Sequence, residues 1–233
     1  MAYYVLVLVI ILEFIAASAG LKYIQKYRVS KITKRLVLIL FFVAITELFS
    51  TYVPIAKASD FEYFGFVKGT PFEKNFWVHN IQLIITFGFF ANYFRSSLKP
   101  GLLASIIKLV IIVFMIGALV NLLLSGVYFN GISKFTYIIG SILLLIAILV
   151  YYFELLRSDN ILRFSQSLTF YISVGLLIYY LTMTPLFIYG SYYYTGESSD
   201  TFNKFYIYTL AIANVVMYGT FTLGFILCKP NQN

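Results

Sequence analysis

Long apolar runs separated by short polar segments dominate the sequence. A helix needs about 20 mostly apolar residues to cross roughly 30 Å of hydrocarbon. The run 142–152 is apolar on every face, so the alternation typical of membrane β-barrels is absent there. The pattern predicts an all-α fold: a polytopic transmembrane bundle of seven helices that forms one domain, 1–233. The predicted spans are 2–21, 36–56, 76–94, 102–126, 136–156, 168–190 and 205–228.

The composition agrees with a membrane protein and removes several kinds of chemistry. Of the residues, 61% are hydrophobic and only 11% are charged, whereas about a quarter are charged in soluble domains. The single cysteine excludes an internal disulfide and a multi-cysteine zinc site, and the single histidine excludes paired-histidine metal motifs. We therefore expect neither a metal nor a cofactor.

Lysine and arginine concentrate in alternate connections, which indicates how the bundle is oriented. Basic residues mark the cytoplasmic side of a membrane protein, so we expect the N-terminus outside and the C-terminus in the cytoplasm. The basic strip of the first connection most simply contacts anionic lipid, and no nucleic-acid partner is expected. That strip holds Lys22, Lys26, Arg28, Lys31, Lys34 and Arg35, with no acid.

The first apolar run has a second interpretation, as a secretory signal. Ala17-Ser18-Ala19 resembles a cleavage site after an apolar segment. Against this, the run has no basic segment before it and Glu13 interrupts it. We keep it as the first span.

Aromatic residues are frequent in the connections expected outside, in 57–75 and at 189–194. Aromatic rings commonly lie at the level of the lipid headgroups, which is one interpretation. The other is that the two segments pack as a cap over a cavity. The sequence leaves both open.

Two carboxyl groups fall in the middle of predicted spans, where a charged side chain costs about 3 kcal/mol or more. At about 1.5 Å per residue, Glu13 in 2–21 and Glu47 in 36–56 both lie roughly 16 Å deep. The two spans are antiparallel and joined by a short connection. The carboxyls are thus at the right depth to meet and to share a proton, and we expect them to mark a ligand or proton site.

Other polar side chains lie nearer the outside. His79 and Gln82 share one face of their helix by three-residue spacing, and Thr184 precedes Pro185, which frees a backbone carbonyl. Such groups also form ordinary hydrogen bonds between membrane helices, and that alternative stays open. The predicted ligand or proton site surrounds a polar cavity open to the outside and comprises Glu13, Glu47, His79, Gln82, Asn121, Thr184 and Asn214.

Four stretches, in order along the chain, carry a resemblance: 44–48 (AITEL), 75–80 (NFWVHN), 170–179 (FYISVGLLIY) and 214–218 (NVVMY). The chain resembles a group of small, uncharacterised multi-pass inner-membrane proteins of the Bacteroidetes type, and the likeness spans most of its length. The resemblance implies a location in the bacterial cytoplasmic (inner) membrane. Because some members lie near two-component signalling genes, it also implies membrane sensing, without assigning a role to any residue.

Known reaction motifs, such as nucleophile elbows and phosphate loops, are absent. We therefore expect no enzyme, but an integral membrane binding, sensory or accessory protein. A second hypothesis is a small-solute or proton-coupled transporter that uses the two glutamates, with helices 1–3 and 5–7 as a repeat and helix 4 as a connector. A third is an intramembrane lipid-modifying enzyme that depends on His79. The expected partners are membrane lipids and either a membrane protein or a second copy.

Overall fold

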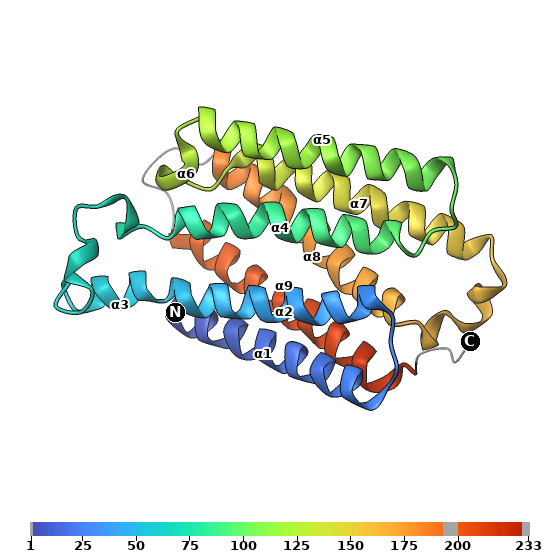
Figure 1. Ribbon diagram of the computed structural model, residues 1–233. Coiled ribbons are helices and arrows are strands. Elements are labelled where there is room, and N and C mark those ends of the chain that lie inside the picture. Colours follow the sequence, from blue (N-terminus) through green and yellow to red (C-terminus); the bar gives the residue numbers. More distant parts are fainter. Residues whose placement is uncertain (1, 193–199, 230–233) are drawn as a thin grey trace.

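The computed structural model describes residues 2–192 and 200–229, and helices make up most of them (Figure 1). No strand occurs within these ranges. Three short 3-10 segments lie in the connections: η1 (Gly65–Val67), η2 (Pro71–Glu73) and η3 (Asp159–Gln166). The α-helices of the described ranges are α1 (Ala2–Lys26), α2 (Lys31–Ser50), α3 (Tyr52–Ala58), α4 (Phe76–Arg95), α5 (Leu102–Leu124), α6 (Val127–Asn130), α7 (Lys134–Leu156), α8 (Leu168–Tyr192) and α9 (Asp200–Leu227).

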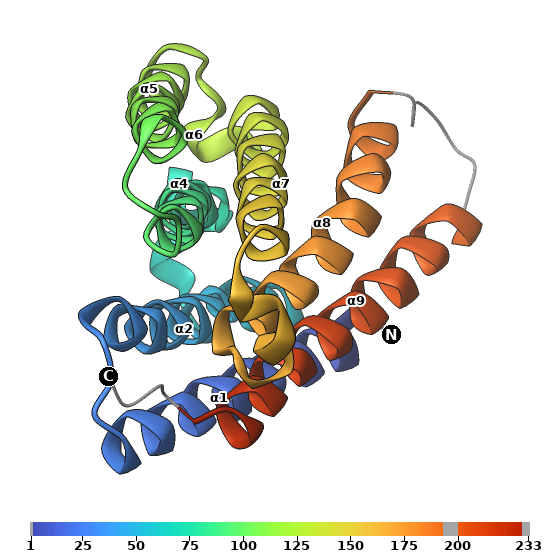
Figure 2. The same ribbon diagram turned by 90° about the vertical axis from the view of Figure 1, so that its right-hand side faces the viewer.

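Most of the long helices form a closed ring. Helices α1, α2, α4, α7, α8 and α9 follow one another around the molecule, each packed on the next, and α9 returns to α1. Helix α5 lies outside this ring, against α4 and α7 (Figure 2). The six helices of the ring therefore surround a central space, and α5 does not border this space.

Six helical stretches of the described residues are long and apolar enough to cross a membrane. Their outer faces carry large apolar side chains, most densely on α5, where Leu123 is 81% exposed. In length and composition the chain thus has the features of a multi-pass membrane protein. The stretches are Tyr3–Lys26, Lys31–Ala58, Leu102–Leu124, Lys134–Leu156, Leu168–Ser191 and Thr201–Leu227.

Helix α4 forms where the sequence predicts a span, 76–94, but it is not among these six. Polar residues such as Asn80 and Gln82 lower its hydropathy, and both are buried. Neighbouring α2, α5 and α7 pack on it, so Phe87 and Phe94 are fully buried. An inner helix of this kind presents little of its surface to lipid and therefore needs less apolarity than its neighbours.

The helix bounds differ most from the prediction at 36–56. Helix α2 begins at Lys31, because the Ser30 hydroxyl caps it by accepting from the Thr33 N–H at 3.3 Å. It ends at Ser50, and α3 carries the chain on to Ala58. Hydropathy alone places the basic residues 31–35 in the connection before the span. The Ser30 cap shows that they belong to the helix.

Helices α8 and α9 approach closely at two glycines. A Cβ added at Gly224 would lie 2.8 Å from the Tyr171 Cβ, and one at Gly175 would overlap the Thr220 hydroxyl. Small residues at such contacts allow two membrane helices to pack backbone to backbone. This packing holds the tyrosines of α8 and α9 at fixed positions along one side of the ring.

The connection between α3 and α4 packs on the end of the bundle where α1 begins, here named the α3 end. The Tyr52 hydroxyl on α3 donates to the Phe72 carbonyl at 2.6 Å. The Phe72 ring lies edge-on to Trp77 and to Phe129, with centroids 5.6 Å apart in both pairs. This segment therefore packs on the bundle; whether it covers a cavity stays a prediction. The other aromatic segment, 189–194, lies partly outside the described residues.

Candidate functional site

A cavity of about 600 Å³ lies inside the ring, here named the ring cavity. All the ring helices line it, and α3 contributes Pro54. Its lining begins near the α3 end, with Tyr3 on α1 and Tyr206 on α9, and continues inward to Tyr218. Binding sites for small molecules commonly enclose about 300–1,000 Å³, so the ring cavity has the size of a ligand site.

Glu13 meets a tyrosine at the inner part of the ring cavity. The Tyr218 hydroxyl on α9 donates to Glu13 Oε1 on α1 at 2.9 Å. Only 3% of Glu13 is exposed, and its second oxygen, Oε2, is buried without a hydrogen-bond partner among the described residues. Packing of α1 on α9 thus holds a carboxyl group in the protein interior with one acceptor oxygen unused.

Glu47 takes part in a second polar group with two side chains of α4. The Gln82 amide nitrogen donates to Glu47 Oε1 at 3.4 Å. His79 Nδ1 lies 3.0 Å from Gln82 Oε1 and 3.6 Å from Glu47 Oε1, so an Nδ1–H faces both oxygens. Because α2 packs on α4, one turn of α4 supplies both partners of the carboxylate.

The rest of the lining is mainly aromatic and aliphatic. Tyr137, Tyr179, Tyr180 and Tyr206 contribute rings from α7, α8 and α9, and Tyr137 stacks on Phe187 at a centroid distance of 4.1 Å. Among the described residues of the lining there is no lysine or arginine. Two carboxyl groups therefore face an aromatic space that lacks a permanent cation, which favours a positively charged guest.

Five of the seven residues proposed from the sequence line the ring cavity: Glu13, Glu47, His79, Gln82 and Asn214. The Asn214 amide donates to the Leu210 carbonyl of its own helix at 2.8 Å. Thr86, one turn further along α4 from Gln82, also lines the cavity. The structure thus brings together the side chains that the sequence placed at the middle and outer depths of four different spans.

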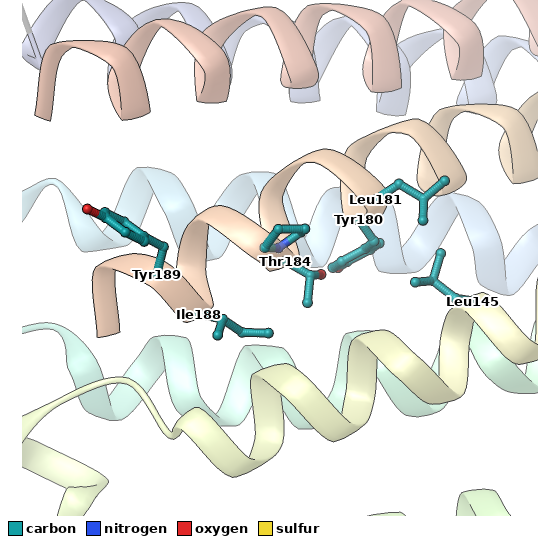
Figure 3. Close-up of a pocket in the computed structure, with 7 residues that line it drawn as sticks. Leu145, Tyr180, Leu181, Thr184, Ile188 and Tyr189 are labelled. Carbon is teal, nitrogen blue, oxygen red and sulfur yellow. The ribbon is translucent and has the colours of Figure 1, made fainter. Parts of the chain in front are cut away.

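Asn121 and Thr184 lie elsewhere. The Asn121 Oδ1 accepts from the Ser133 hydroxyl at 2.9 Å, which fastens the end of α5 to the start of α7. Thr184 lies in a separate groove on α8, next to Leu145 of α7 and Ile188 (Figure 3). Its hydroxyl is buried and has no hydrogen-bond partner in the ranges that the structure describes. Neither residue lines the ring cavity.

Tyr218 is the main residue of the cavity that the site prediction missed. It lies one helical turn beyond Asn214, on the same face of α9, and that spacing is the signal that was available. The chain has 21 tyrosines, so residue type alone does not single it out.

Within the described ranges, no cluster of three or more histidine, cysteine or acidic residues is arranged to hold a metal ion. No protein-family model, curated protein or solved structure matches the chain.

Proposed function

We propose that the chain is an integral membrane binding or sensory protein whose ring cavity takes a small molecule with an apolar body and a positively charged nitrogen. One observation carries the proposal: two carboxyl groups, Glu13 and Glu47, line an aromatic cavity without lysine or arginine in its described lining. The tyrosine rings can surround both the apolar body and the cation.

The two carboxyls have different tasks in this proposal. Glu13 is buried and already accepts a hydrogen bond from Tyr218. Glu47 is partly exposed to the cavity, and His79 and Gln82 hold its Oε1. We therefore assign Glu47 as the counter-ion of the bound nitrogen, and Glu13 as the acceptor at the inner end of the site.

The membrane arrangement that goes with this function has seven spans, with α4 as the seventh. Support comes from α4 itself, which runs beside α2, α5 and α7 for most of its length (Figure 1). The basic connections at the end opposite α3 favour a cytoplasmic location for that end. A ligand would then enter from the outside, past Tyr3 and Tyr206, in a bacterial inner membrane.

A proton-coupled transporter is the second candidate, and one observation favours it. Within the described part of the chain, Glu13 Oε2 is buried without a hydrogen-bond partner, and a second carboxyl lines the same cavity. Such a pair suits a group that takes up and releases a proton. The two candidates differ in whether a bound amine crosses the membrane, which flux into proteoliposomes decides.

Two probes with the same ring and opposite charge test the binding function. The purified full chain is titrated with 2-phenylethylamine and with 3-phenylpropionate, and the shift of the unfolding temperature Tm gives the apparent Kd. We expect the amine to raise Tm and the acid to leave it unchanged. In Glu47→Gln the amine shift should be much smaller, with an apparent Kd about tenfold higher or more, while the matched variant Glu62→Gln, in an exposed loop, should keep the wild-type shift. Equal shifts with both probes, or an undiminished amine shift in Glu47→Gln, would contradict the proposal.

A further inference from the structure

A second cavity, of about 470 Å³, lies at the end opposite α3 and is here named the basic cavity. Three connections meet there with the residues that follow α9: those between α1 and α2, between α4 and α5, and between α7 and α8. All of them lie at the right of the view in Figure 1. The ring cavity and the basic cavity thus occupy opposite ends of the same bundle.

Each of these four segments contributes one cation to the lining: Arg28, Lys99, Arg163 and Lys229. All four side chains are exposed. Within the described part of the chain, none of them forms a side-chain hydrogen bond or an ion pair. Among the described residues of the lining, Glu154 is the only acid, and its Oε2 accepts the Lys99 backbone N–H at 2.8 Å. The cavity therefore carries a clear excess of positive charge.

Two other arginines at this end, one in the last turn of α4 and one at the C-cap of α7, each contact a side chain of that helix. Arg95 donates from Nε to the Asn92 side chain at 2.9 Å. The Arg157 guanidinium lies over the Phe153 ring, 5.1 Å from its centroid. Four more basic residues at this end, Lys22, Lys31, Lys34 and Arg35, also form no side-chain hydrogen bond or ion pair within the described ranges, but they do not line the cavity. The four cations of the cavity are thus distinguished by their convergence from separate segments.

Hydroxyl groups line the same cavity. The Tyr93 hydroxyl and Thr169 Oγ1 lie 3.2 Å apart, and Tyr93 is almost fully buried at the base of the cavity. Ser30 and Thr33 line another wall and also hydrogen-bond to each other, at 3.0 Å. Arginine forks and hydroxyl donors together match the oxygens of a phosphate group, which arginine binds through two parallel hydrogen bonds.

From this convergence we infer that the basic cavity binds a phosphate group, either of an inorganic phosphate or of a lipid phosphomonoester headgroup. Arg28 and Arg163 come from connections far apart in sequence and bind the phosphate group from two sides. Lys99 and Lys229 neutralise its remaining charge. Nothing in this inference depends on what the ring cavity binds.

Thermal unfolding of the full chain in a neutral maltoside detergent tests the inference. The probes are sodium phosphate, with sodium chloride at equal ionic strength as its reference, and dihexanoyl phosphatidic acid, with dihexanoyl phosphatidylcholine as its reference. We expect phosphate or phosphatidic acid to raise Tm above the reference. In the double variant Arg28→Gln/Arg163→Gln the apparent Kd should rise about tenfold or more.

A matched double variant, Arg95→Gln/Arg157→Gln, removes the same charge from the same end but outside the cavity, and should keep the wild-type Kd. Arg28→Lys/Arg163→Lys keeps the charge without the arginine fork and should give an intermediate value. Binding of phosphatidic acid alone would identify a headgroup site, binding of phosphate alone a soluble anion, and binding of both a site open to either source. The inference would be overturned if the two glutamine double variants lost the same affinity. It would also be overturned if neither phosphate nor phosphatidic acid raised Tm above its reference.

Discussion

The two cavities differ in how their charged groups are held. In the ring cavity, helices position the carboxyls of Glu13 and Glu47, and neighbouring side chains hydrogen-bond to both. In the basic cavity, exposed side chains on connections carry the charge and have no ion-pair partner within the described ranges. The first site is preorganised by the fold, whereas the second needs a counter-charge from outside the chain. Substitutions of the buried groups of the ring cavity should therefore affect folding, whereas substitutions of exposed charged groups should affect binding alone.

The largest effect is expected at a close contact between α4 and α7 in the wall of the ring. A Cβ at Gly140 on α7 would overlap the ring of Phe87 on α4, which is fully buried. Gly140→Ala should lower the free energy of unfolding by about 3 kcal/mol. The control is Gly219→Ala, whose Cβ would meet no atom within 4 Å; helix propensity predicts a gain of about 0.5–1 kcal/mol there. Equal stability of the two variants in denaturant titrations would refute the packing assignment.

The next effect is expected at the buried hydrogen bond of the ring cavity. Tyr218→Phe removes the hydroxyl that donates to Glu13 and leaves the carboxyl without this partner. We expect a loss of about 2 kcal/mol in the free energy of unfolding, measured in the same titrations. Tyr208→Phe, at an exposed position of α9, should lose almost nothing. A Tyr218→Phe protein as stable as wild type would mean that the bond does not contribute.

A substitution of Glu47 should weaken ligand binding without destabilising the fold. Because its carboxylate is partly exposed, Glu47→Gln should change the free energy of unfolding by about 0.5 kcal/mol or less. Its apparent Kd for 2-phenylethylamine should nevertheless rise about tenfold or more, since the counter-ion is lost. Isothermal titration calorimetry on folded protein measures the second quantity directly. A variant that loses stability and affinity in parallel would make Glu47 a structural residue instead.

The smallest effect on stability is expected at the basic cavity. Arg163→Gln removes an exposed side chain that has no ion-pair partner in the described part of the chain, so the free energy of unfolding without phosphate should stay within about 0.5 kcal/mol. Thermal unfolding in phosphate-free buffer checks this value. A large loss would show that Arg163 already has a partner in the free protein, and the contrast between the two cavities would then fail.

Much of the helix arrangement could be predicted from the sequence, because long apolar runs are direct consequences of membrane thickness. The bounds of α5 and α7 differ by a few residues from 102–126 and 136–156. Two features could not be predicted. The start of α2 depends on the Ser30 cap, which hydropathy does not register, and the inner position of α4 depends on which neighbours cover it. The repeat of helices 1–3 and 5–7 stays a prediction; the helix assigned as connector, α5, does lie outside the ring.

For the candidate site, the sequence predicts the position of each residue along its helix, but not the side of the helix that faces the ring cavity. Glu13 and Glu47 were found because carboxyls are rare in spans, and both line the ring cavity. Asn121 has a suitable depth yet bonds to Ser133, since nothing in the sequence tells which side of α5 faces inward. The basic cavity could not be predicted from the sequence for a different reason. Its four cations come from four separate segments. In the sequence they only indicate which side of the membrane a connection lies on, and the fold is needed to bring them together.

The most direct test of the central claim is a crystal structure of the protein grown in lipid with 2-(4-bromophenyl)ethylamine, in which the anomalous signal locates the bromine. The account predicts one bromine peak inside the ring cavity, among Tyr137, Tyr179 and Tyr180, with the amine nitrogen at hydrogen-bond distance from Glu47. A bromine peak in the groove at Thr184, or an amine directed away from both carboxyls, would contradict it.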